Sequence, residues 1–442
     1  MRHFVLGFAL VCAAPAFAQD VARMDKVAAA EADSGAFMGA VLVAQDGRIL
    51  FDKGYGSANL EWKIPNDGET KFRLGSITKQ FTAASILLLQ ERGKLRLDAP
   101  VKAYLPDAPA AWDKVTVFHL LTHSAGIPNF TSFDEYSASR TQATTLDALI
   151  ARFRGKPLDF APGERHSYSN SGYVLLTAII EKASGQPYAG FIAENLFKPL
   201  GMADSGYDSH AQVIPHRASG YSPRAGLVVN ADYIDMSIPQ GAGALYSTTH
   251  DLLKWETGLW GGKLLKPESL AAMRTPYKDN YALGIVAVAR DGSTTLSHGG
   301  GIEGFNTWLG YDPDRRITVV VLANLNGNSA DKLGAAMMTL ARGGTITLPS
   351  ERKAVKLEPA LLKAYEGTYE ANPNFSFTIR AEGDRLIAQA TRQPPLELFP
   401  EAKDRFFFRA VDAQMDFTRD ASGKIVGAVM HQNGRDQKAV RK

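Results

Sequence analysis

The sequence predicts a layered α/β or α+β domain followed by a small all-β domain, and three observations support this fold class. Residues 37–55, FMGAVLVAQDGRILFDKGY, are expected to form a β-hairpin because two apolar runs flank the turn at 45–48. Residues 315–325, RRITVVVLANL, form a β-branched run typical of a buried central strand. From about residue 346 short alternating segments are separated by Gly, Asp and Asn turns, as in an antiparallel barrel or sandwich.

Between the hairpin and the β-branched run, the apolar pattern predicts helices over 76–93, 115–123 and 172–187. Strands at both ends with helices between them indicate one sheet that the chain leaves and rejoins, flanked by a helical region. The polar, proline-containing stretch 346–358 predicts a linker. We therefore expect a first domain over 19–345 and a C-terminal domain over 359–442.

Composition and charge exclude several classes of function. The chain has 442 residues, enough for two domains, with 45% hydrophobic and 21% charged residues, which is ordinary for a soluble protein. A formal net charge of +3 without a visible basic cluster indicates neither nucleic acid nor an anionic membrane as partner. No segment beyond the N-terminus has about 18 uninterrupted apolar residues, so no transmembrane helix is expected.

The N-terminus, MRHFVLGFALVCAAPAFAQD, predicts a cleaved signal peptide over 1–18. It has a basic start, an apolar core, and the small-x-small pattern Ala16-Phe17-Ala18 of a signal peptidase site. We therefore expect a periplasmic or secreted bacterial protein. Cys12 is the single cysteine, so the mature chain would have neither disulfides nor thiolate ligands for a metal.

Ser76 and Lys79, in RLGSITKQF, are the first candidate catalytic pair. Residues three apart on a helix lie within side-chain reach, and Ser76 lies at the predicted helix N-terminus. A serine hydroxyl needs an adjacent base, and a desolvated lysine can act as one because burial lowers its pKa. Taken alone, the pattern favours an N-cap serine and a solvated lysine, and the catalytic interpretation depends on the rest of the sequence.

Two further segments add polar groups that suit the same chemistry. Tyr168-Ser169-Asn170 precedes an apolar helix; its tyrosine could shuttle a proton and its asparagine could hold the lysine and a substrate amide. In LSHGGGIEGF, residues 296–305, a polar residue followed by glycines on an edge strand lets a substrate backbone approach closely. The amides of Gly301 and Ser76 could form an oxyanion hole.

In order and spacing, Ser-x-x-Lys, Tyr-x-Asn and His-x-Gly resemble the three motifs of the serine β-lactamase and penicillin-binding-protein superfamily. The resemblance is to the branch of class C β-lactamases, D,D-peptidases, D-aminopeptidases and family esterases, and it covers about residues 35–330. It implies an antiparallel sheet flanked by helices plus a helical region. The C-terminal segment resembles the lipocalin-like β-barrel of some members.

The resemblance also implies a role for each motif residue. Ser76 would be the acylated nucleophile, and Lys79 and Tyr168 would share the general-base role. Asn170 would orient Lys79 and contact the substrate amide. His298 would take the place of a lysine and face the substrate carboxylate, and it would bind substrate together with Gly299 and Gly300. Because histidine is mostly neutral at pH 7, recognition of a free carboxylate is less assured.

The remaining candidates are expected to be structural. His119 and His123 have the spacing of a metal pair but lack the glutamate of the zinc hydrolase motif, and the resemblance implies no metal and no cofactor. Loop or rim positions are expected for Glu164 and Glu303. Core packing is expected for the aromatic residues Trp308, Tyr221 and Tyr281.

These observations predict an exported serine hydrolase that acts through an acyl-enzyme on D-amino-acid peptides, peptidoglycan fragments or small esters. The barrel suggests a partly capped cleft and favours a peptidase or esterase over a dedicated β-lactamase. A class C-type β-lactamase is the alternative, and a non-catalytic penicillin-binding or sensing module is the second. The oligomeric state is open.

Overall fold

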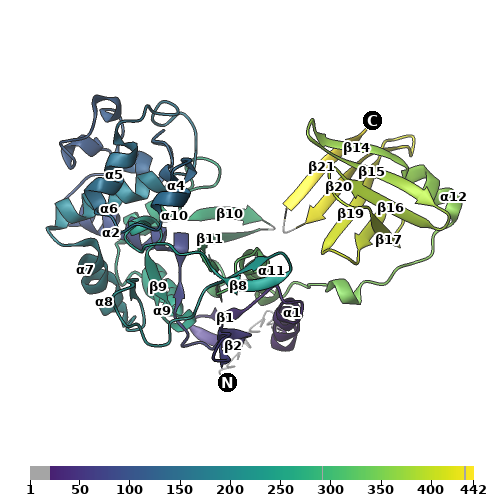
Figure 1. The fold of residues 1–442 in the computed structure, drawn as a ribbon, viewed down its shortest axis with the longest axis horizontal. Coiled ribbons are helices and arrows are strands. Elements are labelled where there is room, and N and C mark those ends of the chain that lie inside the picture. Colours follow the sequence, from purple (N-terminus) through teal and green to yellow (C-terminus); the bar gives the residue numbers. More distant parts are fainter. Residues whose placement is uncertain (1–19, 291, 433–434) are drawn as a thin grey trace, which may run out of the picture.

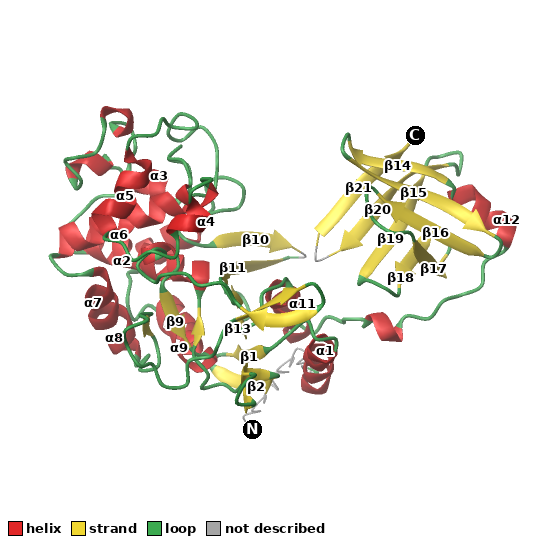
Figure 2. Cartoon of the chain, in the orientation of Figure 1, coloured by secondary structure: helices red, strands yellow, loops and turns green. Residues whose placement is uncertain are grey.

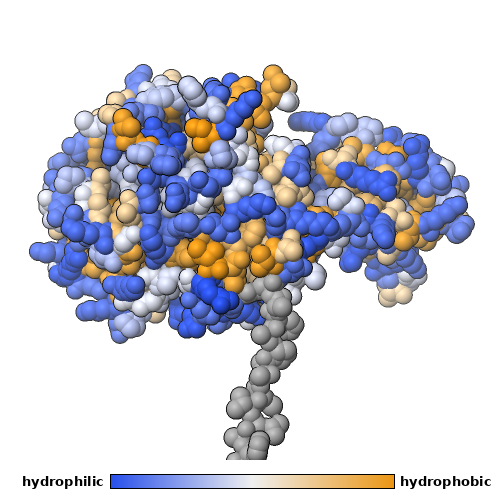
Figure 3. All heavy atoms as spheres, turned by 90° about the horizontal axis from the view of Figure 1, so that it is seen from below, coloured by the Kyte–Doolittle hydropathy of each residue, from blue (hydrophilic) through white to orange (hydrophobic). Residues whose placement is uncertain are grey.

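The computed structural model describes residues 20–290, 292–432 and 435–442. The expected signal peptide, residues 1–18, lies outside this range. Figure 1 shows a larger α/β part, followed along the chain by a smaller all-β part. The two parts are also distinct in the space-filling view of Figure 3, where most of the visible surface is hydrophilic. The predicted fold class is therefore confirmed.

A six-stranded antiparallel sheet forms the centre of the larger part, with strand order β10-β11-β12-β13-β1-β2. The predicted hairpin is β1 and β2, and the β-branched run is β13, which pairs with β1 from Gly39–Ala323 to Gln45–Ile317. As predicted, the chain leaves this sheet after β2, and it rejoins the sheet at β10. The bounds are β1 Gly39–Gln45, β2 Arg48–Tyr55, β10 Val286–Arg290, β11 Ser293–Ile302, β12 Phe305–Asp312 and β13 Ile317–Ala323.

The two faces of this sheet pack against different helices. Alternate residues of a strand point to opposite faces, and in β13 both sets are apolar. Val319 and Val321 pack with α1 (Val21–Asp33) and α11 (Ser329–Ala341). Val320 and Leu322 belong to the larger core shared with the central helices, among them α2. Figure 2 shows these helices on both sides of the strands.

The helical region covers the second face and carries the predicted helices with shifted ends. The first begins as a 3₁₀ turn, η1 (Gly75–Ile77), and the helix over 115–123 shortens to five residues because His123 has a φ of +53°. Gly185, in the left-handed region, ends the third. The helices are α2 Thr78–Glu91, α3 Val117–Leu121, α4 Tyr136–Ser139, α5 Leu146–Arg154, α6 Asn170–Ser184, α7 Tyr188–Ile192, α8 Lys198–Leu200, α9 Thr249–Trp260 and α10 Pro267–Arg274.

Short elements connect these helices. The small strands are β3 Ser57–Asn59, β4 Ile64–Pro65, β5 Phe72–Arg73, β6 Gly206–Tyr207, β7 Tyr221–Arg224, β8 Leu227–Asn230 and β9 Leu245–Ser247. Strand β9 pairs with both β5 and β6, which fixes the chain just before Ser76. The 3₁₀ turns are η2 Val101–Ala103, η3 Ala110–Trp112, η4 Phe130–Ser132, η6 Gln240–Ala242, η7 Pro349–Glu351 and η8 Lys363–Tyr365, and η5 Ala193–Phe197 is a π-helical segment.

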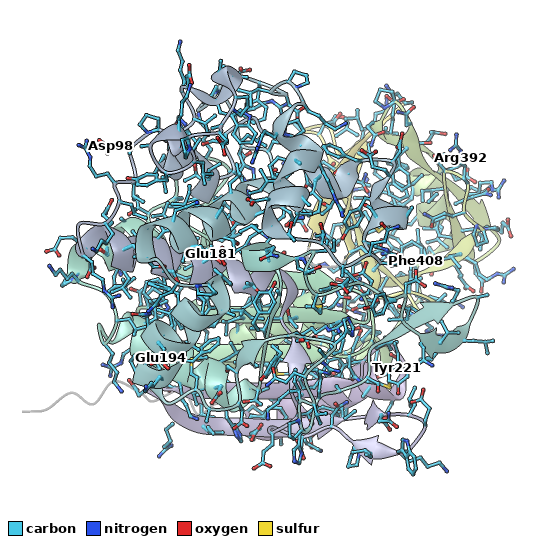
Figure 4. The ribbon with its side chains drawn as sticks, turned by 60° about the vertical axis from the view of Figure 1, so that its left-hand side comes forward. Asp98, Glu181, Glu194, Tyr221, Arg392 and Phe408 are labelled. Atoms are coloured by element: carbon cyan, nitrogen blue, oxygen red, sulfur yellow. The ribbon has the colours of Figure 1, made fainter. Side chains whose placement is uncertain are left out.

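The smaller part is a closed eight-stranded barrel in which every strand pairs with the next along the chain. Aromatic and aliphatic side chains fill its interior, including Phe377, Phe406 and Met415. Arg392 and Phe408 mark this part in Figure 4. Lys332 of α11 forms an ion pair of 2.9 Å with Asp412 of the barrel part. The bounds are α12 Pro359–Leu362, β14 Gly367–Asn372, β15 Phe375–Glu382, β16 Arg385–Ala390, β17 Leu396–Ala402, β18 Arg405–Phe408, β19 Ala413–Arg419, β20 Ile425–Gln432 and β21 Arg435–Arg441.

Across the part of the chain that the structure describes, every helix is too short or too polar to cross a membrane.

Glu256, on α9, is a buried carboxyl group whose ionisation should limit stability. It is 2% exposed and accepts a hydrogen bond of 2.6 Å from Trp260 Nε1. Burial raises the pKa of Glu256 from 4.5 to about 8. Between these values the unfolded chain ionises while the native carboxyl stays protonated, so stability falls as pH rises, by about 1.4 kcal/mol per pH unit.

We expect Glu256→Gln to stabilise the protein at pH 8 by a few kcal/mol, because glutamine keeps the acceptor and cannot ionise. The gain should shrink to near zero at pH 4.5. Urea unfolding of both proteins at several pH values measures the difference. If the difference in unfolding free energy between the two proteins did not change with pH, burial would not raise the pKa of Glu256.

Candidate active site

Ser76 lies in η1, at the start of the buried helix α2. Gly75, just before it, has a φ of +53°, and a Cβ built there would lie 2.8 Å from the Gly301 nitrogen. Glycine at 75 therefore lets the serine turn approach β11 directly. Ser76 opens into a cavity of about 460 Å³. Its lining is Gly75, Ser76, Phe130, Thr131, Tyr136, Arg140, Asn170, Ser222, Asp232, Ile234, Ile238, Pro239, Ala242, Gly243, Gly301, Ile302, Glu303 and Asn326.

Lys79 is fully buried and lies at the centre of the polar contacts. Its Nζ lies 3.0 Å from Ser76 Oγ, 2.9 Å from Asn170 Oδ1 and 2.8 Å from the Ala242 carbonyl oxygen. Burial lowers the pKa of Lys79 well below its usual value, which favours the neutral amine. The predicted proximity of Ser76, Lys79 and Asn170 is thus present in the structure.

The partners of Lys79 determine where its lone pair points. The Asn170 amide oxygen and the Ala242 carbonyl can only accept hydrogen bonds, so each takes one N–H. A neutral amine has two N–H groups, and its remaining position, a lone pair, then faces Ser76 Oγ. In this state the serine hydroxyl donates to Lys79.

Tyr168 approaches the serine from the other side. Its hydroxyl donates to Ser76 Oγ over 2.8 Å, while 37% of the residue stays exposed. Desolvation raises the pKa of Tyr168 above that of a free tyrosine, so the phenol keeps its proton at neutral pH. Lys79 Nζ lies 4.8 Å from the centre of the Tyr168 ring.

Asn170 is the first residue of α6, and the side chains of Asn129 and Thr131 hold its backbone and its amide group. Its backbone N–H donates to Asn129 Oδ1 over 3.0 Å, and its Nδ2 donates to Thr131 Oγ1 over 3.1 Å. With the amide group held in this way, Oδ1 is left to accept from Lys79.

His298 lies on β11 but does not contact the serine group directly. It is 6% exposed, and its Nε2 lies 3.0 Å from the hydroxyl of Tyr281. The His298 and Tyr168 ring centres are 6.3 Å apart. Burial is the main cause that lowers the pKa of His298 to about 4. The imidazole is therefore neutral at physiological pH.

The glycine segment of β11 reaches the cavity at Gly301, while Gly299 and Gly300 lie outside its lining. The β10–β11 register ends with Val286 opposite Ser297, so Gly299, Gly300 and Gly301 lie beyond the last β10 pair. On its other side the segment pairs with β12. Thr307 of β12 donates to the Leu74 carbonyl over 2.7 Å, which ties the segment to the chain before Ser76.

Three contributors, Ala242, Arg140 and Asp232, carry no signal in the sequence that predicted a role. Ala242 binds Lys79 through its carbonyl, which any residue type could supply, so no side-chain pattern marks it. Arg140 and Glu303 form an ion pair in the cavity wall, and Arg140 also reaches Asp232. The predicted rim position of Glu303 therefore becomes a position in the cavity wall. All lining residues lie between Gly75 and Asn326, so these residues give no support to a cleft capped by the barrel.

The other candidates take structural positions. Glu164 accepts from the Ala161 N–H, and Trp308 packs on the α1 and α11 face of the sheet. Tyr221, labelled in Figure 4, is buried and donates to Glu61 over 2.5 Å. Tyr281 is buried as well, and it contacts His298.

His119 and His123 do not form a metal pair. His119 Nδ1 accepts from the Thr116 N–H in a capping box, while His123 lies in the turn after α3. Within the described ranges, no group of three or more His, Cys, Asp or Glu side chains is arranged to hold a metal ion.

Comparison with known proteins identifies the family. Residues 24–342 match the family described as beta-lactamase. The chain belongs to the beta-lactamase family. With this fold and these relatives, it is a hydrolase of the beta-lactamase fold. Residues 351–441, which include the barrel strands, match a family described as a domain of unknown function.

Some relatives of this beta-lactamase family member match nearly the whole chain, and others match mainly its larger part. Penicillin-binding protein 4* of Bacillus subtilis (strain 168) is 30% identical over 441 residues, covering 92% of this chain and 95% of the relative. The structure of an octameric penicillin-binding protein homologue from Pyrococcus abyssi matches with a TM-score of 0.68 and 27% identity. The match covers 95% of this chain and 100% of the homologue. A D-stereospecific amidohydrolase from Streptomyces sp. matches with a TM-score of 0.62 and 29% identity. This match covers 69% of this chain and 94% of the amidohydrolase.

Proposed function

We propose that this chain is an exported serine hydrolase that works through an acyl-enzyme on amide or ester substrates. The observation that carries the proposal is the double contact of Ser76 Oγ, which lies 3.0 Å from a buried lysine nitrogen and 2.8 Å from a tyrosine hydroxyl. A serine nucleophile needs both a base to take its proton and a donor to return it. Lys79 supplies the base and Tyr168 the donor.

In the first half of the reaction, Ser76 Oγ attacks the substrate carbonyl while its proton passes to neutral Lys79. The carbonyl oxygen becomes an oxyanion held by the amides of Ser76 and Gly301. The bond to the leaving group breaks as that group takes the proton of the Tyr168 hydroxyl, and the proton held by Lys79 then replaces it on Tyr168. Water then attacks the ester carbon while Lys79 takes one of its protons, the bond to Ser76 Oγ breaks, and that proton passes to Ser76 as the acid product leaves.

The substrates that we propose are D-amino-acid peptides or amides, peptidoglycan fragments or small esters. Family relatives that are named for penicillin binding and for D-stereospecific amide hydrolysis support this choice. A non-catalytic sensing role is less well supported, because Ser76, Lys79, Tyr168 and Asn170 are joined by direct contacts.

The test is covalent labelling with a fluorophosphonate, read by intact mass. We expect one adduct per chain on the wild type and none on Ser76→Ala. Ser85→Ala, which removes a buried serine of α2 whose hydroxyl donates to the Phe81 carbonyl, is the matched control and should label normally. An unlabelled wild type, or equal labelling of Ser76→Ala, would contradict the acyl-serine mechanism.

Turnover then separates the substrate classes. D-amino-acid amides, p-nitrophenyl esters and nitrocefin are compared by kcat/KM. We expect the amides or esters to be the better substrates. If nitrocefin were by far the best, the chain would be a class C-type β-lactamase instead.

A further inference from the structure

A chain of buried hydrogen bonds connects the tyrosine loop to the glycine strand. It begins at the Ser169 backbone N–H, which donates to His123 Nδ1 over 3.1 Å. Because this nitrogen accepts, a neutral His123 carries its proton on Nε2. That Nε2 lies 3.1 Å from the Tyr281 hydroxyl, so it donates to the phenol oxygen. His123 has a φ of +53°, which is uncommon for a non-glycine residue, and the hydrogen bonds of its ring help to maintain that turn.

The same reasoning, applied at the glycine-strand end of this chain of hydrogen bonds, determines the tautomer of His298. Its Nδ1 lies 2.6 Å from the Gly299 carbonyl oxygen, which can only accept, so Nδ1 carries the proton. In a neutral ring Nε2 is then bare and accepts from Tyr281 over 3.0 Å. Tyr173, the next phenol, donates its own proton to the Leu121 carbonyl over 2.9 Å. Tyr173 could still accept from Tyr281, but a Tyr281 proton pointed there would leave the bare Nε2 of His298 facing an oxygen lone pair at 3.0 Å. The Tyr281 proton therefore goes to His298.

Both nitrogens of His298 are thus occupied within the protein. The ring has no N–H left for a substrate. The groups around it do not favour protonation: Lys79 and Tyr168 lie toward the serine, and Asp331 on α11 faces Gly299 from the opposite side of the strand. His166, behind Tyr281, lies 3.5 Å from Asp279.

The other basic side chains of the site are also engaged within the protein. Lys79 is held by Ser76, Asn170 and Ala242. Among the described residues that line the cavity, Arg140 is the one cationic side chain, and it is bonded to carboxylates of Glu303 and Asp232. Moving a carboxylate out of water without a cationic partner is energetically unfavourable.

We propose that His123 and Tyr281 are positioning residues that hold His298 as the neutral Nδ1–H tautomer. The site consequently favours amide or ester substrates whose leaving group is uncharged. It disfavours substrates whose leaving group ends in a free carboxylate. This inference rests on the proposed serine hydrolase function.

The first test reads the tautomer directly and does not require turnover. Nitrogen-15 NMR of protein labelled at histidine, with His298→Gln for assignment, should show Nδ1 protonated and Nε2 bare at pH 7. The His298 signal should not titrate above pH 5. An Nε2–H tautomer, or a His298 titration near pH 6.5, would overturn the proposal.

The second test compares two substrates that differ only at the leaving end, a D-alanyl-D-alanine peptide with a free carboxylate and its carboxamide. We expect the wild type to prefer the carboxamide about tenfold or more in kcat/KM. Tyr281→Phe removes the donor to Nε2, so His298 protonates more readily and the preference should fall several-fold at pH 5.5 but little at pH 8.

Tyr188→Phe is the control, because it removes an equally buried hydroxyl that contacts Thr82 and not His298. Its preference should match the wild type at both pH values. A wild type that prefers the carboxylate peptide, or an unchanged preference in Tyr281→Phe at pH 5.5, would overturn the inference. Failure of the proposed function itself would appear separately, as loss of phosphonate labelling at Ser76.

Discussion

Replacing Lys79 by methionine is expected to lower kcat/KM for amide or ester hydrolysis by about a thousand-fold, equivalent to about 4 kcal/mol of transition-state stabilisation. The variant loses the lone pair that faces Ser76 Oγ at 3.0 Å, while the apolar side chain fills a similar volume. Steady-state kinetics with a D-amino-acid amide and with a p-nitrophenyl ester measure the loss.

The pH profile identifies the mechanism of that loss. Because burial lowers the pKa of Lys79, wild-type activity should rise as pH increases through that pKa and then stay level. Activity should fall again only near the raised pKa of Tyr168, where the phenol loses its proton. In Lys79→Met the acid limb that belongs to Lys79 should disappear.

Lys71→Met is the matched control for Lys79→Met. Lys71 is also buried, at 9% exposure, and its Nζ pairs with Asp204 at 3.0 Å, away from the serine. We expect its kcat/KM to stay within a few-fold of the wild type. Equal losses in the two variants would indicate a structural effect and contradict a base role for Lys79.

Gly300→Ala is expected to destabilise the protein by about 3 kcal/mol and to reduce kcat/KM about a hundred-fold. A Cβ built at Gly300 would lie 2.0 Å from the Leu74 carbonyl oxygen and 2.2 Å from Thr307 Oγ1. The backbone before Ser76 would have to move, and the serine would shift relative to the strand. Urea unfolding and steady-state kinetics measure the two effects.

Gly301→Ala is the control for the stability effect. A Cβ there would meet only the Asn306 Nδ2 atom, at 3.4 Å, so the unfolding free energy should change little. If Gly300→Ala were as stable as Gly301→Ala, the close packing of the glycine strand on the serine turn would not constrain this site.

The fold could be predicted where local pattern and burial agree. The hairpin over 37–55 and the β-branched run of 315–325 identified the strands β1, β2 and β13, because a strand buried on both faces is apolar throughout. Helix ends were less predictable. The turn at His123 depends on a positive φ that its contacts maintain, and residue type alone does not signal such a turn.

Within the site, the sequence by itself determined the Ser76–Lys79 pair, because a spacing of three on a helix places two side chains together whatever the rest of the chain does. Motif order also named Tyr168 and Asn170, and both contact that pair. Only the tertiary structure decided that the Ala242 carbonyl completes the set of Lys79 partners. A backbone oxygen carries no residue-type signal.

The tertiary structure likewise decided the state of His298. The sequence placed a histidine at the strand, but its tautomer depends on Tyr281 and on His123, which lies 175 positions before it (298 − 123). A proton's position is set by all the donors and acceptors that surround a ring in space. The sequence therefore determined which chemical groups meet at the serine, and long-range packing determined which of them hold a proton.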